Sequence, residues 1–418
     1  MATPFDLRAR LPSPKHPDGG LLSSKGVTSD FQRTPVTLRH PGYPDQHNIL
    51  LVFPALDLHK QDSDNDGRID FGLHHETARV ACAIVANCRW DGFLSEDKAS
   101  GARPVMIGPD DLLLGRSYYF HIPNSDSDSD SDTTPDGPYP IVPSFAHFQF
   151  PHQNLPPTWK ASSLTLPASQ SNAVLARDVS CRVTASKLGT EIAHLIPRSE
   201  DTWFTTNQMS QYSSRPDAFI ANSTDDVRNA MLLSSNIHST FDQRRFVLVP
   251  KRGSWAIHVL SGLPGDELAA VYHNVQPQQL SGLAIEYLFA RFAWTVLAQG
   301  AFLRTGVRRR LIIVPREDGV PRVSDVSGQE CRTMFAPNSL SGSKSRSQSP
   351  KKRVRDDTAG GDVVEDYDDL MYGDDSVWDT RGRSRKRQFY ASNSISSSAA
   401  STLEHWRDVS TDCEGQVW

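Results

Sequence analysis

Apolar residues along the chain fall into short strand-like runs and longer helical stripes. The runs ILLVF at 49–53 and YYFHIP at 118–123 predict strands, and the apolar spacing within 76–90 predicts a helix. The segment 283–303 predicts a helix of the core, because its apolar residues recur on one stripe. That stripe consists of Ile285, Leu288, Phe292 and Val296. The mixture of these elements predicts an α+β fold.

Polar segments divide the chain into regions. We expect a flexible N-terminus, an α+β region, a second globular region with a hairpin and the core helix, and a disordered charged tail. An acidic run of alternating Ser and Asp interrupts the first globular region and predicts a solvated loop. The expected boundaries are 1–34, 35–160 with the loop at 124–138, 175–310 and 336–418.

The second globular region contains the most informative pattern. IAHLI predicts a short strand that Pro197 ends, and AMLL after Asn229 predicts another. Ser234 or Ser235 is placed to cap a helix in which His238 and Asp242, four residues apart, share one face. FVLVP and WAIHVL, joined by KRGS, then predict a β-hairpin.

This pattern resembles the HNH endonuclease family, whose core is a β-hairpin and a helix around one metal ion, the ββα-metal or His-Me finger. The matching residues are His194 in AHLIP, Asn229 in RNAMLL and His238 in HSTFD. Other segments, including HPGY, CRWDGFLS and EYLFARFAW, resemble a group of fungal HNH-domain proteins from about 35 to 310.

The resemblance implies a chemistry. His194 is expected to be the general base that takes a proton from water, and Asn229 to hold or orient the loop that bears it. A divalent metal ion, Mg²⁺ or Mn²⁺, would neutralise charge on the phosphate. The implied metal ligands are His238, Asp242 and Glu191, and the implied phosphate-binding residues are Arg198, Arg244 and Arg245. The predicted function is metal-dependent hydrolysis of DNA phosphodiester bonds.

The chain departs from the family pattern in several ways. Many HNH proteins carry Asp or His directly before the base, where this chain has Ala193, so Glu191 would have to substitute. A long insertion separates His194 from Asn229, and the cysteine pairs that bind zinc in some HNH proteins are absent. The alternative function is therefore a catalytically degenerate HNH-fold module that binds DNA or protein.

Composition limits the location and the partners. The 44 Lys and Arg against 49 Asp and Glu exclude a basic protein that coats nucleic acid through bulk charge. There is no signal peptide and no run of about 20 apolar residues, which predicts an intracellular protein without membrane contact. The basic runs 349–355 and 381–387 resemble nuclear-localisation signals, and the alternative is that they are merely solvated. The oligomeric state stays open.

Two further motifs have competing interpretations. The segment 62–73 starts like an EF-hand loop, with Asp62, Asp64 and Asp66 at the first ligand positions, but position 12 is Leu73 instead of Glu. It is either a calcium site or an acidic turn. Cys181 and His194 are conceivable as a nucleophile pair, although no third, orienting residue is indicated.

Overall fold

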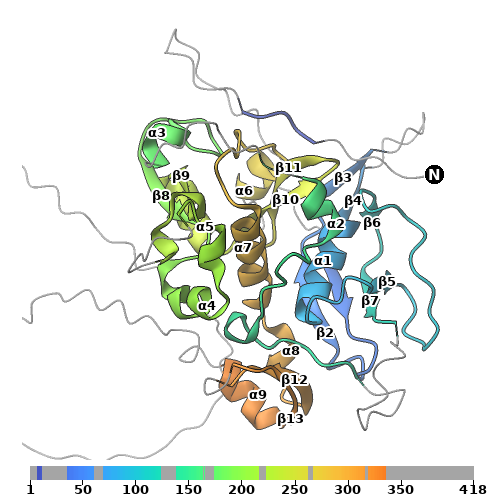
Figure 1. Cartoon of the computed structure of the whole chain (residues 1–418). Helices are drawn as coiled ribbons and strands as arrows, with labels where there is room; N and C mark the ends of the chain where they lie inside the picture. Colours follow the sequence, from blue (N-terminus) through green and yellow to red (C-terminus); the bar gives the residue numbers. More distant parts are fainter. Residues whose placement is uncertain are drawn as a thin grey trace, which may run out of the picture. The chain divides into compact units, whose positions relative to one another are not determined.

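The first part of the chain builds two small sheets and a buried helix (Figure 1). One sheet has the order β2-β1-β7-β5, in which β1 and β7 run parallel, and the other has the order β3-β4-β6. The strands are β1 Val36–Arg39, β2 Ile49–Phe53, β3 Asp57–Lys60, β4 Ile69–His74, β5 Phe93–Ser95, β6 Leu112–Leu113 and β7 Ser117–His121. The predicted strands at 49–53 and 118–123 are therefore confirmed, the second shifted to 117–121.

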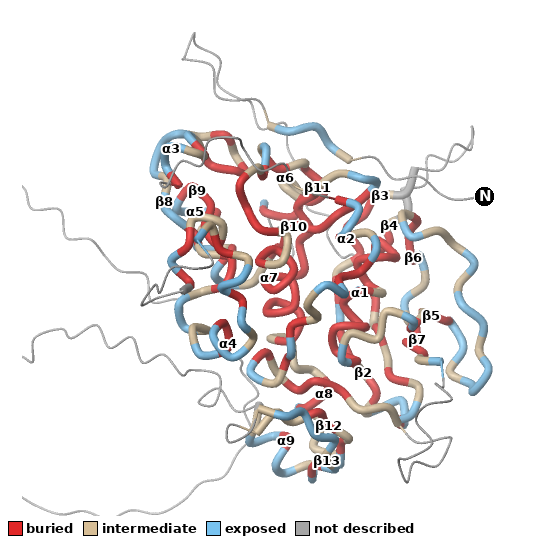
Figure 2. The backbone as a smooth tube through the Cα atoms, in the orientation of Figure 1, coloured by how far each residue is buried: buried red, intermediate tan, exposed pale blue. Residues whose placement is uncertain are grey.

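Helix α1 (His75–Val85) follows β4 directly and is buried on nearly all sides, as the red tube in Figure 2 shows. The predicted helix at 76–90 is confirmed in place but ends five residues early. Asn87 and Cys88 both have a φ of 61°, and a left-handed backbone cannot continue an α-helix. The chain then passes through η1 (Phe145–His147) and α2 (Pro157–Ala161) to the second region.

Strands β8 (Thr190–His194) and β9 (Ala230–Ser234) form an antiparallel pair, and α5 (Ser235–Asp242) follows β9 without a gap. Strand β8 begins two residues before the predicted run and ends at His194. The segment between the strands contains η2 Arg198–Glu200, α4 Asp201–Thr206, η3 Met209–Tyr212, η4 Ser223–Asp225 and η5 Val227–Asn229, and α3 Val174–Asp178 precedes β8.

The predicted hairpin is formed by β10 (Phe246–Lys251) and β11 (Ser254–Val259). Arg252 and Gly253 connect the strands with φ values of 51° and 70°, the signs that a tight type I′ hairpin turn requires. Glycine adopts this conformation without a Cβ clash.

The predicted core helix divides into α7 (Ile285–Leu297) and α8 (Ala301–Arg304), separated at Gly300, whose φ is 49°. Helix α7 lies in the middle of the molecule, between α1 and the β8–β9–α5 unit (Figure 1). Trp159 of α2 packs against Phe289 and Phe292 of α7 and against Trp255 of β11. The two predicted globular regions therefore share one hydrophobic core.

Further helices and strands lie outside the elements that the sequence predicted. They are α6 Glu267–Tyr272, β12 Arg309–Ile313, β13 Arg322–Val326 and α9 Gly328–Phe335. Strands β12 and β13 pair antiparallel, and α9 packs against α8. The mixture of helices with mainly antiparallel sheets confirms the α+β class.

The structure is a computed structural model that describes residues 7–11, 35–60, 69–123, 138–162, 164, 174–215, 223–261, 267–315 and 319–335. Several predictions fall outside these residues. They concern nearly all of the N-terminus 1–34, the first ligand positions of the calcium-like loop (Asp62, Asp64 and Asp66), the acidic loop up to 137, and the tail 336–418 with both basic runs. No helix in the described part of the chain is long and apolar enough to cross a membrane.

Candidate active site

The β8–β9–α5 unit places the predicted site residues on one small scaffold. Along the β8–β9 ladder Glu191 pairs with Leu233 and His194 with Ala230. Helix α5 packs on both strands through the buried side chains of Ile237 and Phe241. Because residues i and i+1 point in directions about 100° apart on a helix, His238 and Asp242 project beside this apolar stripe. Ser234 occupies the N-cap, but its hydroxyl faces the Cys181 thiol and does not cap the helix backbone.

His238 lies between two carboxylates. Its Nδ1 is 2.8 Å from Oε2 of Glu191, and its Nε2 is 3.3 Å from Oδ2 of Asp242. The His238 side chain is 20% exposed, whereas Glu191 and Asp242 are 54% and 60% exposed. At the surface, the two carboxylates therefore lie beside different nitrogens of the His238 ring, and the three predicted metal ligands do not converge on one point.

His194 ends β8 and is partly buried. Its Nε2 lies 3.3 Å from Oδ1 of Asp225, which also accepts a hydrogen bond from Nε of Arg198 at 2.6 Å. Burial and the nearby Arg198 lower the pKa of His194, and Asp225 opposes that shift only in part. The charge of His238 lowers the pKa further, so the two histidines are close enough to interact. His194 is consequently neutral at pH 7 and able to accept a proton.

Asn229 is fully buried and holds the segment that leaves β8. Its side-chain oxygen accepts from the Ile196 backbone N–H at 2.9 Å, and its amide donates to the carbonyls of Ile196 and Thr224 at 3.0 and 2.8 Å. Its own carbonyl accepts from the Leu195 N–H at 2.7 Å. These bonds fix the backbone immediately after His194.

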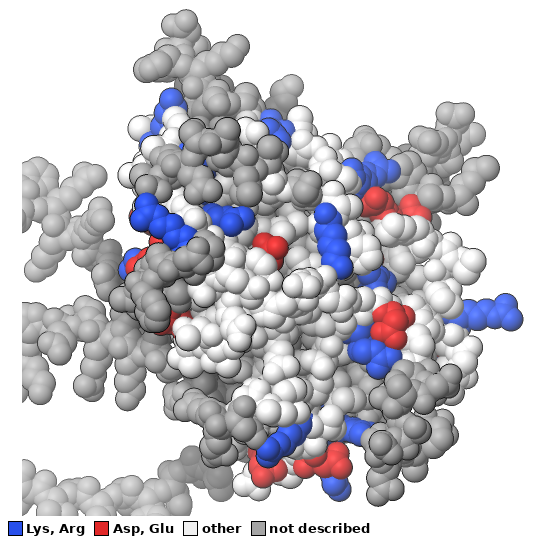
Figure 3. Space-filling view, viewed as in Figure 1, with Lys and Arg blue, Asp and Glu red and all other residues white. Residues whose placement is uncertain are grey.

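The three predicted phosphate-binding arginines occupy different surroundings. Arg198 is 67% exposed and paired with Asp225. The guanidinium of Arg244 lies 3.8 Å from the ring centroid of Trp294, a cation–π contact that covers one of its faces. Burial lowers the pKa of Arg244 and that of Arg245. On the face drawn in Figure 3, Lys and Arg are spread singly among other residues and do not form one continuous patch.

Sequence reasoning missed Arg291 of α7, which is 1% exposed. It donates from Nη1 to the carbonyl of Leu195 at 3.3 Å and from Nη2 to the carbonyl of Phe241. Burial lowers its pKa to about 9, so it remains charged at pH 7. A sequence signal was present, because a lone arginine within the apolar run EYLFARFAW must find partners if the helix is buried.

Sequence reasoning also missed Asp225, the partner of His194. It lies in the polar insertion, where no spacing or periodicity distinguishes one acidic residue from another. The alternative pairing of Cys181 with His194 is not what the structure shows. The buried Cys181 thiol accepts instead from the backbone N–H groups of Val183 and Thr184, at 3.4 and 3.3 Å.

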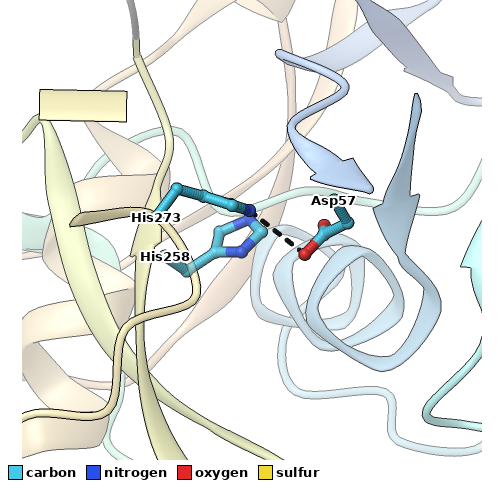
Figure 4. A group of neighbouring side chains, drawn as sticks. All are labelled: Asp57, His258 and His273. Atoms are coloured by element: carbon cyan, nitrogen blue, oxygen red, sulfur yellow. Dashed lines mark hydrogen bonds and ion pairs between the residues drawn. The ribbon is translucent and has the colours of Figure 1, made fainter. Parts of the chain in front are cut away.

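A second histidine–carboxylate cluster lies in the interior. Within the described residues, one group of three metal-ligand side chains has its ligand atoms within 4.8 Å of one another: Asp57, His258 and His273 (Figure 4). This cluster already contains a cation, because Lys251 donates to Oδ1 of Asp57 at 2.8 Å and both side chains are fully buried. A divalent ion beside the buried Lys251 would add uncompensated positive charge. We therefore assign the cluster a structural role.

Hydrogen bonds fix the protonation of most of this interior cluster. Oδ1 of Asp57 also accepts from His273 Nε2 and Asn274 Nδ2, at 3.1 and 2.7 Å. Nδ1 of His273 accepts from the Val259 N–H, so its ring is neutral. Burial alone would raise the pKa of Asp57, but Lys251 and His273 outweigh it and hold that pKa well below its usual range. Both ring nitrogens of the buried His258 are without a hydrogen-bond partner, which nothing in the described part of the chain explains.

A cavity of about 880 Å³ lies in the first region. It is open to solvent and lined by residues of the segment 95–118, among them Asp97, Arg103 and Tyr118. None of the predicted site residues lines it. The described contacts therefore give it no part in the predicted chemistry.

Comparison with known proteins identifies the segment that carries the first cluster. Residues 179–249 match the family model described as HNH endonuclease, and this range contains His194, Asn229 and His238. Comparison with curated proteins and with solved structures gave no match. The match includes β8, β9, α5 and the first four residues of β10, and it ends before α7. Residues 179–249 of this chain are therefore similar to the HNH endonuclease domain, a similarity that indicates a nuclease-type function and a nucleic acid substrate.

Proposed function

We propose that this domain hydrolyses phosphodiester bonds of DNA with the help of a divalent metal ion. The observation that carries the proposal is that a partly buried histidine, His194, and a second histidine that faces two exposed carboxylates, His238, are held on one ββα unit. Phosphodiester hydrolysis needs a base that takes a proton from water and a positive charge that neutralises the phosphate. In this proposal His194 is the base, and a cation held by His238, Glu191 and Asp242 would supply the charge.

The residues around His238 suit Mg²⁺ or Mn²⁺. One imidazole and two carboxylates are nitrogen and oxygen donors that such ions accept, and the exposed sides of Glu191 and Asp242 leave room for water ligands. A bound cation would neutralise the negative charge that develops on the phosphate in the transition state. The buried Ala193 contributes no ligand, so Glu191 takes the acidic position in this proposal.

The protein residues divide the remaining work. His194 accepts the proton of the attacking water, and Asp225 at 3.3 Å stabilises the imidazolium that results. Asn229 keeps His194 in place through its bonds to Ile196. Arg198 is the most exposed of the three predicted arginines and can exchange Asp225 for a phosphate oxygen of the substrate.

Nicking of supercoiled plasmid DNA by the full chain in Mg²⁺ or Mn²⁺ tests the proposal. We expect EDTA to abolish nicking, and His194→Ala to reduce it by roughly 10²–10⁴-fold because the general base is lost. His238→Ala should raise the Mn²⁺ concentration needed for half-maximal nicking. The control is His152→Ala, which removes a partly buried histidine that contacts Tyr212 outside the ββα unit. If His194→Ala nicks as fast as wild type, His194 is not the base.

A second candidate is a catalytically degenerate HNH module that binds DNA or protein. It is favoured by one observation, that Glu191 and Asp242 contact different nitrogens of His238, so the three ligands do not converge on one point. Under this proposal the wild-type chain binds a labelled DNA duplex in fluorescence anisotropy equally well with and without EDTA, and nicks nothing. Metal-dependent nicking that His238→Ala abolishes would exclude it.

A further inference from the structure

We propose that Arg291 of α7 is a positioning residue of the HNH site, which holds the backbone beside His194 at a fixed place relative to the helix that bears His238 and Asp242. The inference rests on the proposed function for the roles of these three residues. Helix α7 lies outside the segment that matches the HNH family, so the site would be completed by a part of the chain beyond the family domain.

The hydrogen bonds of Arg291 join the two halves of the site. Its Nη1 donates to the carbonyl of Leu195, the residue after His194, and its Nη2 donates to the carbonyl of Phe241, the residue before Asp242. Its guanidinium carbon also lies 3.6 Å from the centroid of the Phe241 ring. One rigid, planar group therefore contacts the end of β8 and the end of α5 together.

The location of Arg291 at the end of α5 has an electrostatic consequence. Helix α5 has no basic residue in its last turn, and its last carbonyl groups carry partial negative charge. The buried guanidinium supplies the missing positive charge from another helix, and it also attracts the carboxylate of Asp242. Lysine would keep the positive charge, but it lacks the planar, forked guanidinium that donates to the Leu195 and Phe241 carbonyls in different directions.

Trp294, one turn later on α7, adds a second connection of the same kind. Its indole N–H donates to Oε1 of Glu200, which follows the loop after His194, at 3.0 Å. Its ring lies under the guanidinium of Arg244, which comes just after α5, and 4.5 Å from that of Arg291. Arg291 and Trp294 of α7 thus each contact both the segment after β8 and the chain at or just after the end of α5.

Packing alone does not account for Arg291. A buried guanidinium loses its hydration, a cost that an apolar side chain of similar length would avoid. An apolar residue would leave the Leu195 and Phe241 carbonyls without this donor. The replacement Arg291→Met therefore tests positioning with the volume nearly kept, and Arg291→Lys tests the fork with the charge kept.

The chain offers a matched control in Arg309 of β12. It is also 1% exposed, donates to the carbonyl of His47 and to Oγ1 of Thr305, and packs on the rings of Phe302 and Tyr43. None of these partners belongs to the proposed HNH site. Arg309→Lys and Arg309→Met thus remove an equally buried guanidinium and report the cost of that loss to stability alone.

The first experiment measures kcat and KM for plasmid nicking, together with Tm, for full-length Arg291→Lys and Arg309→Lys. We expect kcat of Arg291→Lys to fall by about 10–100-fold with little change in KM, because misplacement of a catalytic group by about 1 Å has an effect of that size. Arg309→Lys should lose a similar amount of Tm and keep the wild-type kcat. A wild-type kcat for Arg291→Lys overturns the inference.

The second experiment does not depend on activity. The imidazole ¹H–¹³C signals of His194 and His238 are recorded by NMR in wild type and in Arg291→Met and Arg309→Met, before and after Mn²⁺ addition. We expect both signals to move in Arg291→Met alone, and the Mn²⁺ concentration that broadens His238 to rise about tenfold or more. Unchanged signals in a folded Arg291→Met overturn the inference, and Arg291→Lys serves in its place if Met prevents folding. Absence of nicking by wild type would contradict the proposed function only, since the imidazole signals still decide the role of Arg291.

Discussion

Two histidine–carboxylate clusters in this protein combine the same residue types in opposite surroundings. At the HNH site, His238 faces two carboxylates that are 54% and 60% exposed. In the interior, Asp57 is fully buried, and Lys251 balances its charge at 2.8 Å. The interior group has the tighter geometry, yet the surface group is the better candidate for chemistry, because it has excess negative charge and access to solvent.

The comparison teaches that close approach of potential ligands does not by itself indicate a metal site. Buried polar side chains need hydrogen-bond partners, and Asp57, Lys251, His273 and Asn274 are joined by hydrogen bonds to one another. Because Asp57 belongs to β3 and the other three to β10 and the segment after β11, this set fastens the first region to the second. The predictions below test that difference.

The largest effect is expected from removal of the interior cation. Lys251→Met should lower the free energy of unfolding by about 3–5 kcal/mol, because it leaves the Asp57 carboxylate buried without its partner. Urea denaturation followed by far-UV circular dichroism measures this. The control is Lys98→Met, which removes the exposed ion pair of Lys98 with Asp45 and should leave the urea midpoint almost unchanged. Equal midpoints for the two variants would contradict the structural role of the interior cluster.

The interior histidines should make stability depend on pH. Burial lowers the pKa of His273 to about 4 and that of His258 well below its usual value, whereas both titrate near 6.5 in the unfolded chain. The unfolded state therefore binds protons first as the pH falls, so stability is lost from about pH 6.5 downwards, by on the order of 2 kcal/mol for His273 at pH 5. Urea midpoints at pH 7, 6 and 5 measure this, and His273→Gln should flatten the dependence. A pH-independent midpoint would show that these histidines are not held neutral.

The smallest effect on stability is expected at the surface cluster. Arg198→Ala removes an ion pair whose arginine is 67% exposed, so the free energy of unfolding should change by less than about 1 kcal/mol. If Arg198 binds phosphate as proposed, Arg198→Ala should raise KM for DNA and leave the free energy of unfolding almost unchanged. A loss of several kcal/mol would instead place Arg198 among the structural residues.

Much of the fold was predictable from local pattern. The strand at 49–53, the β10–β11 hairpin and helices α1, α5 and α7 were predicted, because their apolar spacing reflects which face is buried. The ends were less predictable. Helix α1 ends at Val85 because Asn87 and Cys88 have left-handed backbone conformations, with φ of 61°. The residue type does not predict that conformation at a cysteine. Residues 309–335 had no predicted element, since β12 and β13 are short and β13 is largely exposed.

The candidate site shows the same division. His194, Asn229 and His238 were predicted as site residues from their order and neighbours, and they lie within residues 179–249, which match the HNH family model. The partners Asp225 and Arg291 were not found, because they lie 31 and 97 residues from His194 in the chain and only folding brings them to the site.

The sequence alone determined which side chains the proposed phosphodiester chemistry would use and which segments form most of the strands and helices, because both follow from residue type and from spacing along the chain. Only the tertiary structure decided which histidine–carboxylate cluster lies at the surface and which is buried beside Lys251. It also placed an arginine of α7 between the two halves of the HNH site. The physical reason is that burial and charge balance depend on neighbours that are distant in sequence and meet only in the shared core.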